Sequence, residues 1–372
     1  MHAGRPFIQK GVVIYTDHFR SYLNTDIRPD YFPFLSVNNT LLCPIVHRER
    51  ILSDRPRVKA AIEMIHSGLS SSSLNEQHNF SKRNPLPILL TNLDESRCYK
   101  DYYDYPRLTW SIPALKRHME WCKIVPMPTY AIWKAFSTDH TTMKSWDKTF
   151  ALRSEQYPWE KKTNVAVWRG TSTCDFHYKG HDLSDTPRGR IVRLSMEHPN
   201  LIDAGFVRLA QQFENATFTE KNKTILTERM KFEDMMNYKA IIDVDGNDWS
   251  SRFPMLLCMN SVVIKIDPDY IEYFYHELQP MVHYVPASLE NLTTVAAYVL
   301  DQKNEVEMRD MVHSANSWCR TKMIKDRLVK DMMSQLDKYE VMLSEYLHKK
   351  NIADEELASS LRQYDDFTPC FD

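Results

Sequence analysis

The second half of the chain alternates short apolar runs with amphipathic stretches in a regular order. Apolar runs typical of buried strands occur at Val165–Trp168, Leu201–Ala204, Ala240–Val244, Ser261–Ile266 and His283–Val285. Helices are predicted from Thr186, over Thr227–Asn237, Ser251–Met259 and Tyr270–Leu278, and from Ser288 to Leu300. Near-continuous apolar strands that alternate with helices are typical of a parallel sheet covered on both faces. The sequence therefore predicts an α/β fold for this half.

A long helical pattern follows the predicted sheet. From Glu305 to about Lys350, apolar residues recur at steps of three and four positions. One unbroken helix of this length is unusual in a compact domain, so a break is expected near Arg320–Lys325. The aromatic and methionine side chains of this stripe are expected to serve packing.

The first half shows shorter and weaker patterns. A helix is predicted at Arg55–His66, with Gly68 to end it, and a buried strand at Leu86–Leu93. Lys123–Pro128 is a further strand candidate, and Tyr157–Lys162 is typical of a connector. We therefore predict two domains, residues 1–156 and residues 157–340.

Composition narrows the classes of protein. The 372 residues carry 26% charged side chains and a net charge of −2, which argues against a dedicated binder of nucleic acid or of anionic membranes. There is no apolar run of 18 residues, and the amino terminus lacks the apolar core of a signal peptide. A cytoplasmic protein is expected, or one of the secretory lumen if the amino terminus is truncated. The seven scattered cysteines favour reduced thiols over a disulfide framework.

Polar residues with phosphate-binding chemistry follow the strand at Ala240–Val244. Asp245 and Gly246 are turn residues, and Ser250 or Ser251 could cap a helix with Arg252 in its first turn. A strand that leads through a glycine turn to a helix start presents free N–H groups to an anion, and an arginine adds a planar charged donor. The alternative is an ordinary β-turn-α corner with a surface arginine.

Two similar features occur earlier in the same half. Arg169-Gly170-Thr171-Ser172 follows the first strand, and the helix opened by Thr186-Pro187 carries Arg188 and Arg190. On neighbouring units of one parallel sheet, the three features together predict a pocket for a diphosphate. Asp243 and Asp245 also admit a divalent metal, although Asp245-Gly246 makes a favourable turn by itself.

A carboxylate at the end of the Leu86–Leu93 strand is the candidate general base. Asp94 precedes an aromatic segment that includes Tyr105 and Trp110, a combination suited to a sugar or peptide cleft. The alternative is a loop aspartate that caps or turns the chain. The signatures of dinucleotide-binding proteins, P-loop kinases, zinc proteases and α/β-hydrolases are absent from the sequence.

The chain resembles glycosyltransferase family 90, which comprises protein O-glucosyltransferases and capsule-associated xylosyltransferases. The resemblance runs from about Leu86 to Cys319. It rests on Trp168-Arg169-Gly170-Thr171, on the block Tyr238 to Arg252, on Val263-Ile264-Lys265 and on Leu278 to Pro286. Trp168, Thr171 and Met281 depart from the usual residues of these motifs, and both Arg188 and Arg190 are eligible for the family's basic helix.

The resemblance implies a GT-B fold, with two Rossmann-like domains facing a cleft and the segment 340–372 packing back on the first. It implies metal-independent, inverting transfer of glucose or xylose from a UDP-sugar to a hydroxyl of a glycan or glycoprotein. Asp94 would be the base, with Tyr105 and Trp110 on the acceptor side. The donor would contact Arg169, Gly170, Thr171, Ser172, Arg188, Arg190, Asp245, Gly246, Trp249, Ser250, Ser251 and Arg252. A monomer without cofactor is expected; a sugar-nucleotide- or glycan-binding protein without turnover is the alternative.

Overall fold

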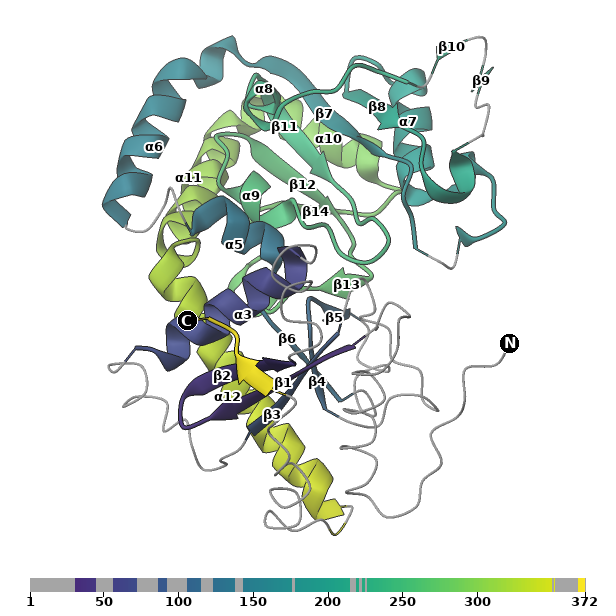
Figure 1. The fold of residues 1–372 in the computed structure, drawn as a ribbon. Coiled ribbons are helices and arrows are strands. Elements are labelled where there is room, and N and C mark those ends of the chain that lie inside the picture. Colours follow the sequence, from purple (N-terminus) through teal and green to yellow (C-terminus); the bar gives the residue numbers. More distant parts are fainter. Residues whose placement is uncertain are drawn as a thin grey trace. The chain divides into compact units, whose positions relative to one another are not determined.

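The computed structural model describes two compact units (Figure 1). One combines Met1–Lys134 with Asp326–Asp372, and the other is Ala135–Lys325. The described residues are 31–44, 56–71, 86–91, 106–114, 123–137, 143–175, 178–214, 219–220, 223–224, 226–349, 351 and 367–371. The division at 156 and 340 stays a prediction, and each unit is described by itself.

The second unit is built on a parallel five-stranded sheet. Its strands are β7 (Thr163–Thr171), β8 (Ile202–Arg208), β11 (Tyr238–Asp243), β12 (Val262–Ile266) and β14 (Val285–Ala287), in the order β14-β12-β11-β7-β8. Every neighbouring pair is parallel. The strands are rich in valine and isoleucine, which pack well on a pleated surface buried on both sides. The predicted parallel sheet is confirmed.

Several helices of this unit are shorter than the sequence pattern predicted. Its helices are α6 (Met143–Gln156), α7 (Pro187–Glu197), α8 (Phe232–Met235), α9 (Phe253–Leu257), α10 (Leu292–Leu300) and α11 (Glu305–Lys322). Single turns of 3-10 helix lie at Trp159–Lys161 (η3), Leu183–Asp185 (η5), Gln211–Phe213 (η6), Tyr275–Glu277 (η7) and Gln302–Asn304 (η8). Short extended pieces lie at Thr219–Glu220 (β9), Lys223–Thr224 (β10) and Tyr270–Ile271 (β13).

One face of the sheet forms the main core of this unit. Alternate strand residues such as Ala166, Trp168 and Ile242 pack with apolar residues of α7, α10 and α11. The opposite face is also buried but carries charge, because Asp243 and Lys265 are 0% and 1% exposed. Side chains of successive strand residues point to opposite faces, so one strand supplies both an apolar and a polar layer.

Two predicted helices of this unit are wrong for most of their length. In Thr227–Asn237 only Phe232–Met235 is helical, because the Thr227 N–H donates to the Phe206 carbonyl at 2.8 Å and holds its end of the segment against β8. Tyr270–Leu278 is extended and then turns once. There Phe274 packs within 5.3 Å of the Trp318 ring, so tertiary packing overrides helix propensity.

The predicted break in the long helical pattern is confirmed. Helix α11 ends at Lys322 and α12 (Lys325–Lys349) begins three residues later. Met323 lies between them with no exposed surface. Arg320 and Lys322 in the last turn of α11 also suit the negative end of its dipole.

The first unit contains a mixed six-stranded sheet in the order β15-β2-β1-β3-β4-β6. The strands are β1 (Tyr31–Val37), β2 (Thr40–Pro44), β3 (Leu86–Thr91), β4 (Arg107–Thr109), β6 (Ile124–Pro126) and β15 (Phe367–Pro369), with β5 (Ile112–Pro113) outside this sheet. Strands β15, β2, β1 and β3 pair antiparallel, whereas β3, β4 and β6 pair parallel. The sheet therefore departs from the wholly parallel arrangement of a Rossmann-like domain.

The helices of the first unit pack closely. They are α3 (Pro56–Leu69), α5 (Tyr130–Phe136) and the long α12. A side chain at Gly68 would stand 2.0 Å from the Met333 sulfur, so glycine permits the approach of α3 to α12. The predicted helix stop at Gly68 is wrong by one residue, because α3 continues to Leu69.

Two disulfides correct the expectation of reduced thiols. Cys43 of β2 bonds to Cys370 next to β15, and Cys258 after α9 bonds to Cys319 of α11. The partners are 327 and 61 residues apart, so no local spacing in the sequence reveals them. Cys174 is the free cysteine among the described residues, and it is buried.

Loss of the Cys258–Cys319 disulfide is expected to destabilise the second unit. The bond closes a loop of 61 residues, and Cys319→Ser should lower the free energy of unfolding by about 2–4 kcal/mol. Urea unfolding followed by tryptophan fluorescence measures it. Reductant should lower the free energy of unfolding of the parent protein by a similar amount, and that of the variant by less. Equal stability of parent and variant would contradict a structural role for this bond.

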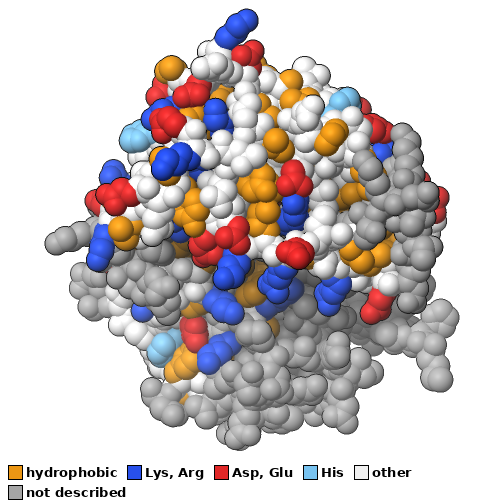
Figure 2. Space-filling view, turned by 90° about the horizontal axis from the view of Figure 1, so that it is seen from above, with side chains coloured by type: hydrophobic (Ala, Val, Ile, Leu, Met, Phe, Trp, Pro, Cys, Tyr) orange, Lys and Arg blue, Asp and Glu red, His pale blue; other side chains and the backbone are white. Residues whose placement is uncertain are grey.

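The described surface does not carry charge of a single sign. Figure 2 shows acidic and basic side chains on the same face, in keeping with the net charge of −2. Within the described part of the chain, no helix has both the length and the apolar character of a membrane span.

Candidate functional site

The candidate site lies where the parallel strands of the second unit end. Helix α7 begins there as predicted, because the Thr186 hydroxyl accepts from the Gly189 N–H at 3.1 Å and Pro187 occupies the first turn. A side chain at Gly189 would stand 1.8 Å from the Leu183 carbonyl oxygen. The start of α7 is thereby fixed against η5, and it places Arg188 next to the strand ends.

Arg188 joins the ends of β7 and β11. Its Nε donates to the Asp245 carbonyl at 3.0 Å, and its Nη1 donates to the Thr171 carbonyl at 2.9 Å and to the Thr173 hydroxyl at 2.6 Å. The side chain is 9% exposed. Burial, together with the positive charge of Arg252 nearby, lowers the pKa of Arg188 to about 10. An anion bound here would offset both effects, since it returns an opposite charge to a desolvated cation.

Gly246 keeps the approach to Arg188 open. A side chain at this position would lie 3.0 Å from Nη2 of Arg188 and 3.4 Å from the Thr173 hydroxyl. No hydrogen bond of this Nη2 atom to a described residue occurs. The predicted turn glycine therefore has a second role: without a side chain it leaves the Arg188 guanidinium accessible.

Arg252 provides a second buried guanidinium beside Arg188. Its Nη1 donates to the Arg169 carbonyl at 2.6 Å, whereas its buried Nη2 has no acceptor among the described residues. Burial lowers the pKa of Arg252, and the carboxylate of Asp243 opposes that shift. A buried charged donor without an acceptor is costly, and an anionic oxygen is the acceptor that suits it best.

The predicted helix start at this corner is wrong. Neither Ser250 nor Ser251 caps α9; Arg252 occupies the position before the helix without a side-chain capping bond. Instead the Ser250 hydroxyl donates to Asp243 at 2.5 Å. Helix α9 has only five residues, so the arginine side chains, and not a helix dipole, carry the positive charge of the site.

The side chain of Arg169 binds Asp203 and does not join the pair formed by Arg188 and Arg252. Its guanidinium forms an ion pair with the Asp203 carboxylate at 2.8 Å and donates to the Asp203 carbonyl, while the Tyr238 hydroxyl donates to the same carboxylate at 3.3 Å. Asp203 lies beside Val167 in the sheet, two positions before Arg169. The guanidinium thus reaches back along the sheet, and Arg169 meets Arg252 through its backbone carbonyl.

A buried charge network underlies the two arginines. The Lys265 ammonium lies 2.9 Å from the Asp243 carboxylate and 2.7 Å from the Asp245 carboxylate. Burial alone would lower its pKa, but the two carboxylates hold the pKa of Lys265 well above its usual value. The carboxylates that suggested a metal are thus bound by a lysine, and among the described residues no cluster of three or more ligands for a metal occurs.

The remaining predicted donor residues have mainly structural contacts. The Ser172 hydroxyl donates to the Ala210 carbonyl and accepts from the Ala210 N–H, which ties the end of β7 to the segment after β8. Arg190 forms an exposed ion pair with Glu290 at 3.0 Å. Of the two eligible arginines, Arg188 therefore lies at the strand ends. Trp249 is 8% exposed.

The predicted acceptor side lies mostly outside the described residues. Asp94 and Tyr105 lie outside the described residues, and so do the alternative carboxylates Asp101 and Asp104. Trp110 is described: it is 1% exposed and lies edge-on to Tyr130.

A cavity of about 200 Å³ opens beside Arg188. It is lined by residues that follow four of the strands, among them Asp175, Asp245, Gly246, Asp267 and Ser288. The Tyr270 hydroxyl donates to Asp175 at 3.1 Å within this lining. The cavity is smaller than the roughly 300–1,000 Å³ of typical ligand pockets, so it suits part of a nucleotide rather than a whole sugar nucleotide.

Sequence reasoning missed Thr173, Tyr270 and the role of Lys265. Thr173 is the last of three consecutive hydroxyl residues that begin at Thr171, the end of β7, and this run is the signal that could have pointed to it. Lys265 is the one charged residue of the buried strand β12, and a lysine in that position needs a carboxylate partner. Tyr270 lay inside a predicted helix that does not form.

Several known proteins are similar in sequence to this chain. The profile of Glycosyl transferase family 90 matches residues 115–363. The chain is 31% identical over 173 residues to Protein O-glucosyltransferase 2 of Danio rerio, covering 45% of this chain and 31% of the relative. It is 29% identical over 199 residues to the O-glucosyltransferase rumi homolog of Aedes aegypti, covering 50% and 46%.

Two further similarities extend over more of the chain. Protein O-glucosyltransferase 1 of Homo sapiens is 23% identical over 258 residues, covering 65% of this chain and 61% of the relative. The match to the crystal structure of a glycosyltransferase from Rickettsia africae ESF-5 covers 68% of each chain, with 12% sequence identity and a TM-score of 0.36. The chain thus matches about a third to three fifths of the length of these curated relatives.

Proposed function

Since the chain belongs to glycosyl transferase family 90, we propose that it transfers glucose or xylose from a UDP-sugar to a hydroxyl of a glycan or glycoprotein. The relatives are named O-glucosyltransferases, which favours glucose as the first donor to test. One observation carries the proposal: the guanidiniums of Arg188 and Arg252 lie together at the strand ends, and the buried Nη2 of Arg252 has no acceptor among the described residues. The GT-B architecture is part of this proposal.

The diphosphate would bind at Arg188 and Arg252. Negative charge grows on the departing diphosphate as the bond to the sugar breaks, so fixed cations stabilise the transition state more than the ground state. Loss of one such donor typically costs about 3 kcal/mol of transition-state stabilisation. The cavity next to Arg188 would take the nucleoside end, since it has room for part of the donor.

Asp94 is the proposed general base. An inverting transfer needs one carboxylate to take the proton of the acceptor hydroxyl as that oxygen attacks the anomeric carbon. Three carboxylates of the second unit are held by basic side chains: Asp243 and Asp245 are bound to Lys265, and Asp203 is bound to Arg169. They are therefore poor candidates, which favours a base outside this charge network.

Asp94→Asn is expected to leave UDP affinity unchanged while sugar transfer falls at least about a hundredfold, the usual range for removal of a general base. Calorimetry with UDP and a transfer assay measure the two quantities. Asp101→Asn and Asp104→Asn are matched controls that should transfer normally. Full activity of Asp94→Asn, with loss in one of the controls, would move the base to that residue.

The test of the function is UDP release with a panel of UDP-sugars. Release from UDP-glucose or UDP-xylose that rises with added acceptor glycoprotein is expected. A metal-independent reaction should proceed unchanged with a chelator, because Lys265 supplies the positive charge at Asp243 and Asp245. Binding of UDP without release would favour the alternative, a sugar-nucleotide-binding protein without turnover.

We favour an oxidising compartment, such as the secretory lumen, over the cytoplasm that the sequence suggested. The disulfides Cys43–Cys370 and Cys258–Cys319 support this, because structural disulfides are rare where thiols are kept reduced. Thiol labelling of the protein isolated from its native source, with and without reductant, tests the preference.

A further inference from the structure

A second cavity lies at the other edge of the parallel sheet and is not part of the donor site. It has a volume of about 440 Å³ and is lined by α6, η3, Asn260 and one stripe of α11. Trp159 and Glu160 of its lining precede β7, and Asn260 precedes β12. These are the amino ends of strands whose carboxyl ends face the two arginines, so the cavities are separated by the length of the sheet.

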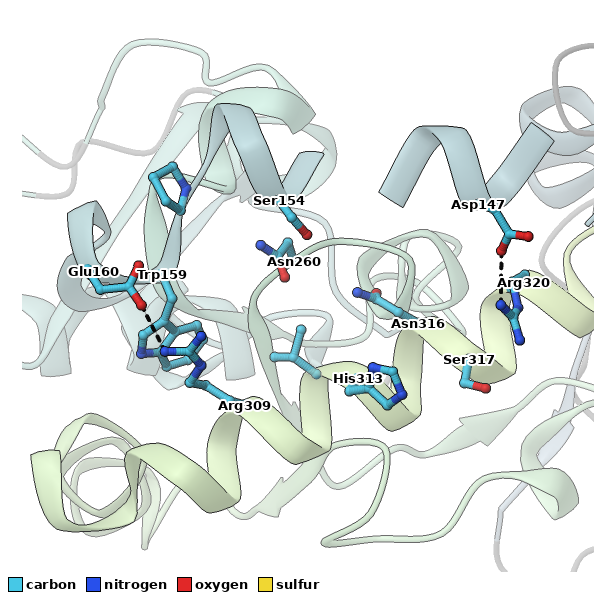
Figure 3. A pocket seen from close by; sticks show the side chains of 12 residues that line it. Asp147, Ser154, Trp159, Glu160, Asn260, Arg309, His313, Asn316, Ser317 and Arg320 are labelled. Carbon is cyan, nitrogen blue, oxygen red and sulfur yellow. Dashed lines mark hydrogen bonds and ion pairs between the residues drawn. The ribbon is translucent and has the colours of Figure 1, made fainter. Parts of the chain in front are cut away.

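The charged residues of this cavity neutralise one another. Arg309 pairs with Glu160 at 2.8 Å, and Arg320 pairs with Asp147 at 2.9 Å. Figure 3 shows these two ion pairs on either side of the cavity, with the polar side chains between them. Two positive and two negative charges leave these four residues with no net charge, so they do not favour an anion over a cation.

Neutral hydrogen-bonding groups line the cavity between the two ion pairs. The Asn260 amide donates to the Tyr157 carbonyl at 3.3 Å. The Asn316 amide, oriented to donate, reaches the Leu257 and Met259 carbonyls at 3.1 Å each. Both amide nitrogens are therefore held by backbone carbonyls, and neither side-chain oxygen accepts a bond that is recorded among the described residues, so both can accept from a ligand.

Three further polar groups of the lining are available as well. The side chains of Ser154, His313 and Ser317 are exposed, and none bonds to another described residue. Hydroxyl and imidazole groups both donate and accept, so with the two amides they match a ligand that carries several hydroxyls. Because the positions of the amides are fixed before binding, little conformational entropy is lost on association.

From this neutral, preorganised lining we propose a second ligand site, specific for an uncharged, hydroxyl-rich ligand: a sugar ring of a glycan. The site would hold a glycan at a distance from the reaction centre, and it does not depend on which donor the protein uses. A single sugar ring makes few contacts, so its affinity is expected in the millimolar range.

The buried indole of Trp159 offers a local readout. Its ring is 6% exposed, and its Nε1 has no partner among the described residues. In protein labelled with 5-fluorotryptophan, the fluorine signal of Trp159 is assigned with Trp159→Phe. Methyl β-glucoside and methyl β-xyloside should shift this signal in a saturable way.

Two variants of one helix decide the outcome. Ser317→Phe places a bulky ring in the cavity and should abolish the shift. Ser314→Phe is the matched control: Ser314 is three residues away, lies outside the lining and donates to the Asp310 carbonyl at 2.9 Å. Arg252→Ala should retain the shift, which separates this site from the donor site. No saturable shift in the parent protein, or an equal loss in both phenylalanine variants, would overturn the proposal.

Discussion

Arg252→Ala is expected to weaken UDP binding by about 10- to 100-fold, since a hydrogen bond to a charged group contributes about 1.5–3 kcal/mol. Sugar transfer should fall below detection, because the same guanidinium would stabilise the diphosphate as it leaves. Calorimetry with UDP measures the first effect and UDP release the second. Arg252→Lys should recover only part of the affinity, because an ammonium lacks the planar fork that contacts the Arg169 carbonyl and could bind a phosphate at the same time.

Arg190→Ala is the control for this prediction. Arg190 lies on the same helix as Arg188, but its guanidinium is exposed and paired with Glu290. Its removal should leave UDP affinity within about twofold, because exposed ion pairs contribute about 0–1 kcal/mol. If Arg252→Ala binds UDP as the parent does, or if Arg190→Ala is the variant that fails, Arg252 is not a phosphate ligand.

Lys265→Met is expected to lower the free energy of unfolding by about 3–5 kcal/mol, because it removes the ammonium that pairs directly with two buried carboxylates. Asp243 and Asp245 would repel each other, and the Asp245 carbonyl that accepts from Arg188 would lose its fixed position. UDP affinity should therefore fall together with stability. Urea unfolding and calorimetry measure the two effects.

Lys239→Met is the control for Lys265→Met. Lys239 lies on the neighbouring strand β11, but its bond to Glu305 is longer, at 3.4 Å, and both partners are partly exposed. This change should cost less than about 1 kcal/mol. If Lys265→Met does not fold, Asp243→Asn keeps one carboxylate on the lysine and should show a smaller loss. Equal stability of the parent protein and both Lys265→Met and Asp243→Asn would contradict the charge network.

The periodicity of the sequence was sufficient for the parallel sheet. Strands such as Ala240–Val244 are mostly apolar, with Asp243 as the one charged residue, and a sheet covered on both sides buries them. The cap and proline at Thr186-Pro187 fixed the start of α7 for a local reason, a hydrogen bond within one turn. Where the signal depended on helix propensity alone, as at Tyr270–Leu278, aromatic packing decided otherwise.

Only part of the predicted candidate site is assembled in the structure. The sequence predicted that Arg169, Arg188 and Arg252 lie together, and in the structure the side chains of Arg188 and Arg252 do. The Arg169 side chain lies on the same sheet face as Asp203 and pairs with it. The two residues are on different strands, so the spacing of residues along the sequence does not reveal this pair. The same holds for Lys265, whose two carboxylates become neighbours only when β11 and β12 pair.

By itself the sequence determined the α/β class of the second unit, the break between α11 and α12 and the family, because each depends on periodicity or on blocks of contiguous residues. Tertiary structure alone decided which arginine reaches the strand ends, which carboxylates a buried lysine occupies and which cysteines join across 61 and 327 residues. Those outcomes depend on contacts between distant segments, whose free energies are set by burial and geometry that no local pattern encodes.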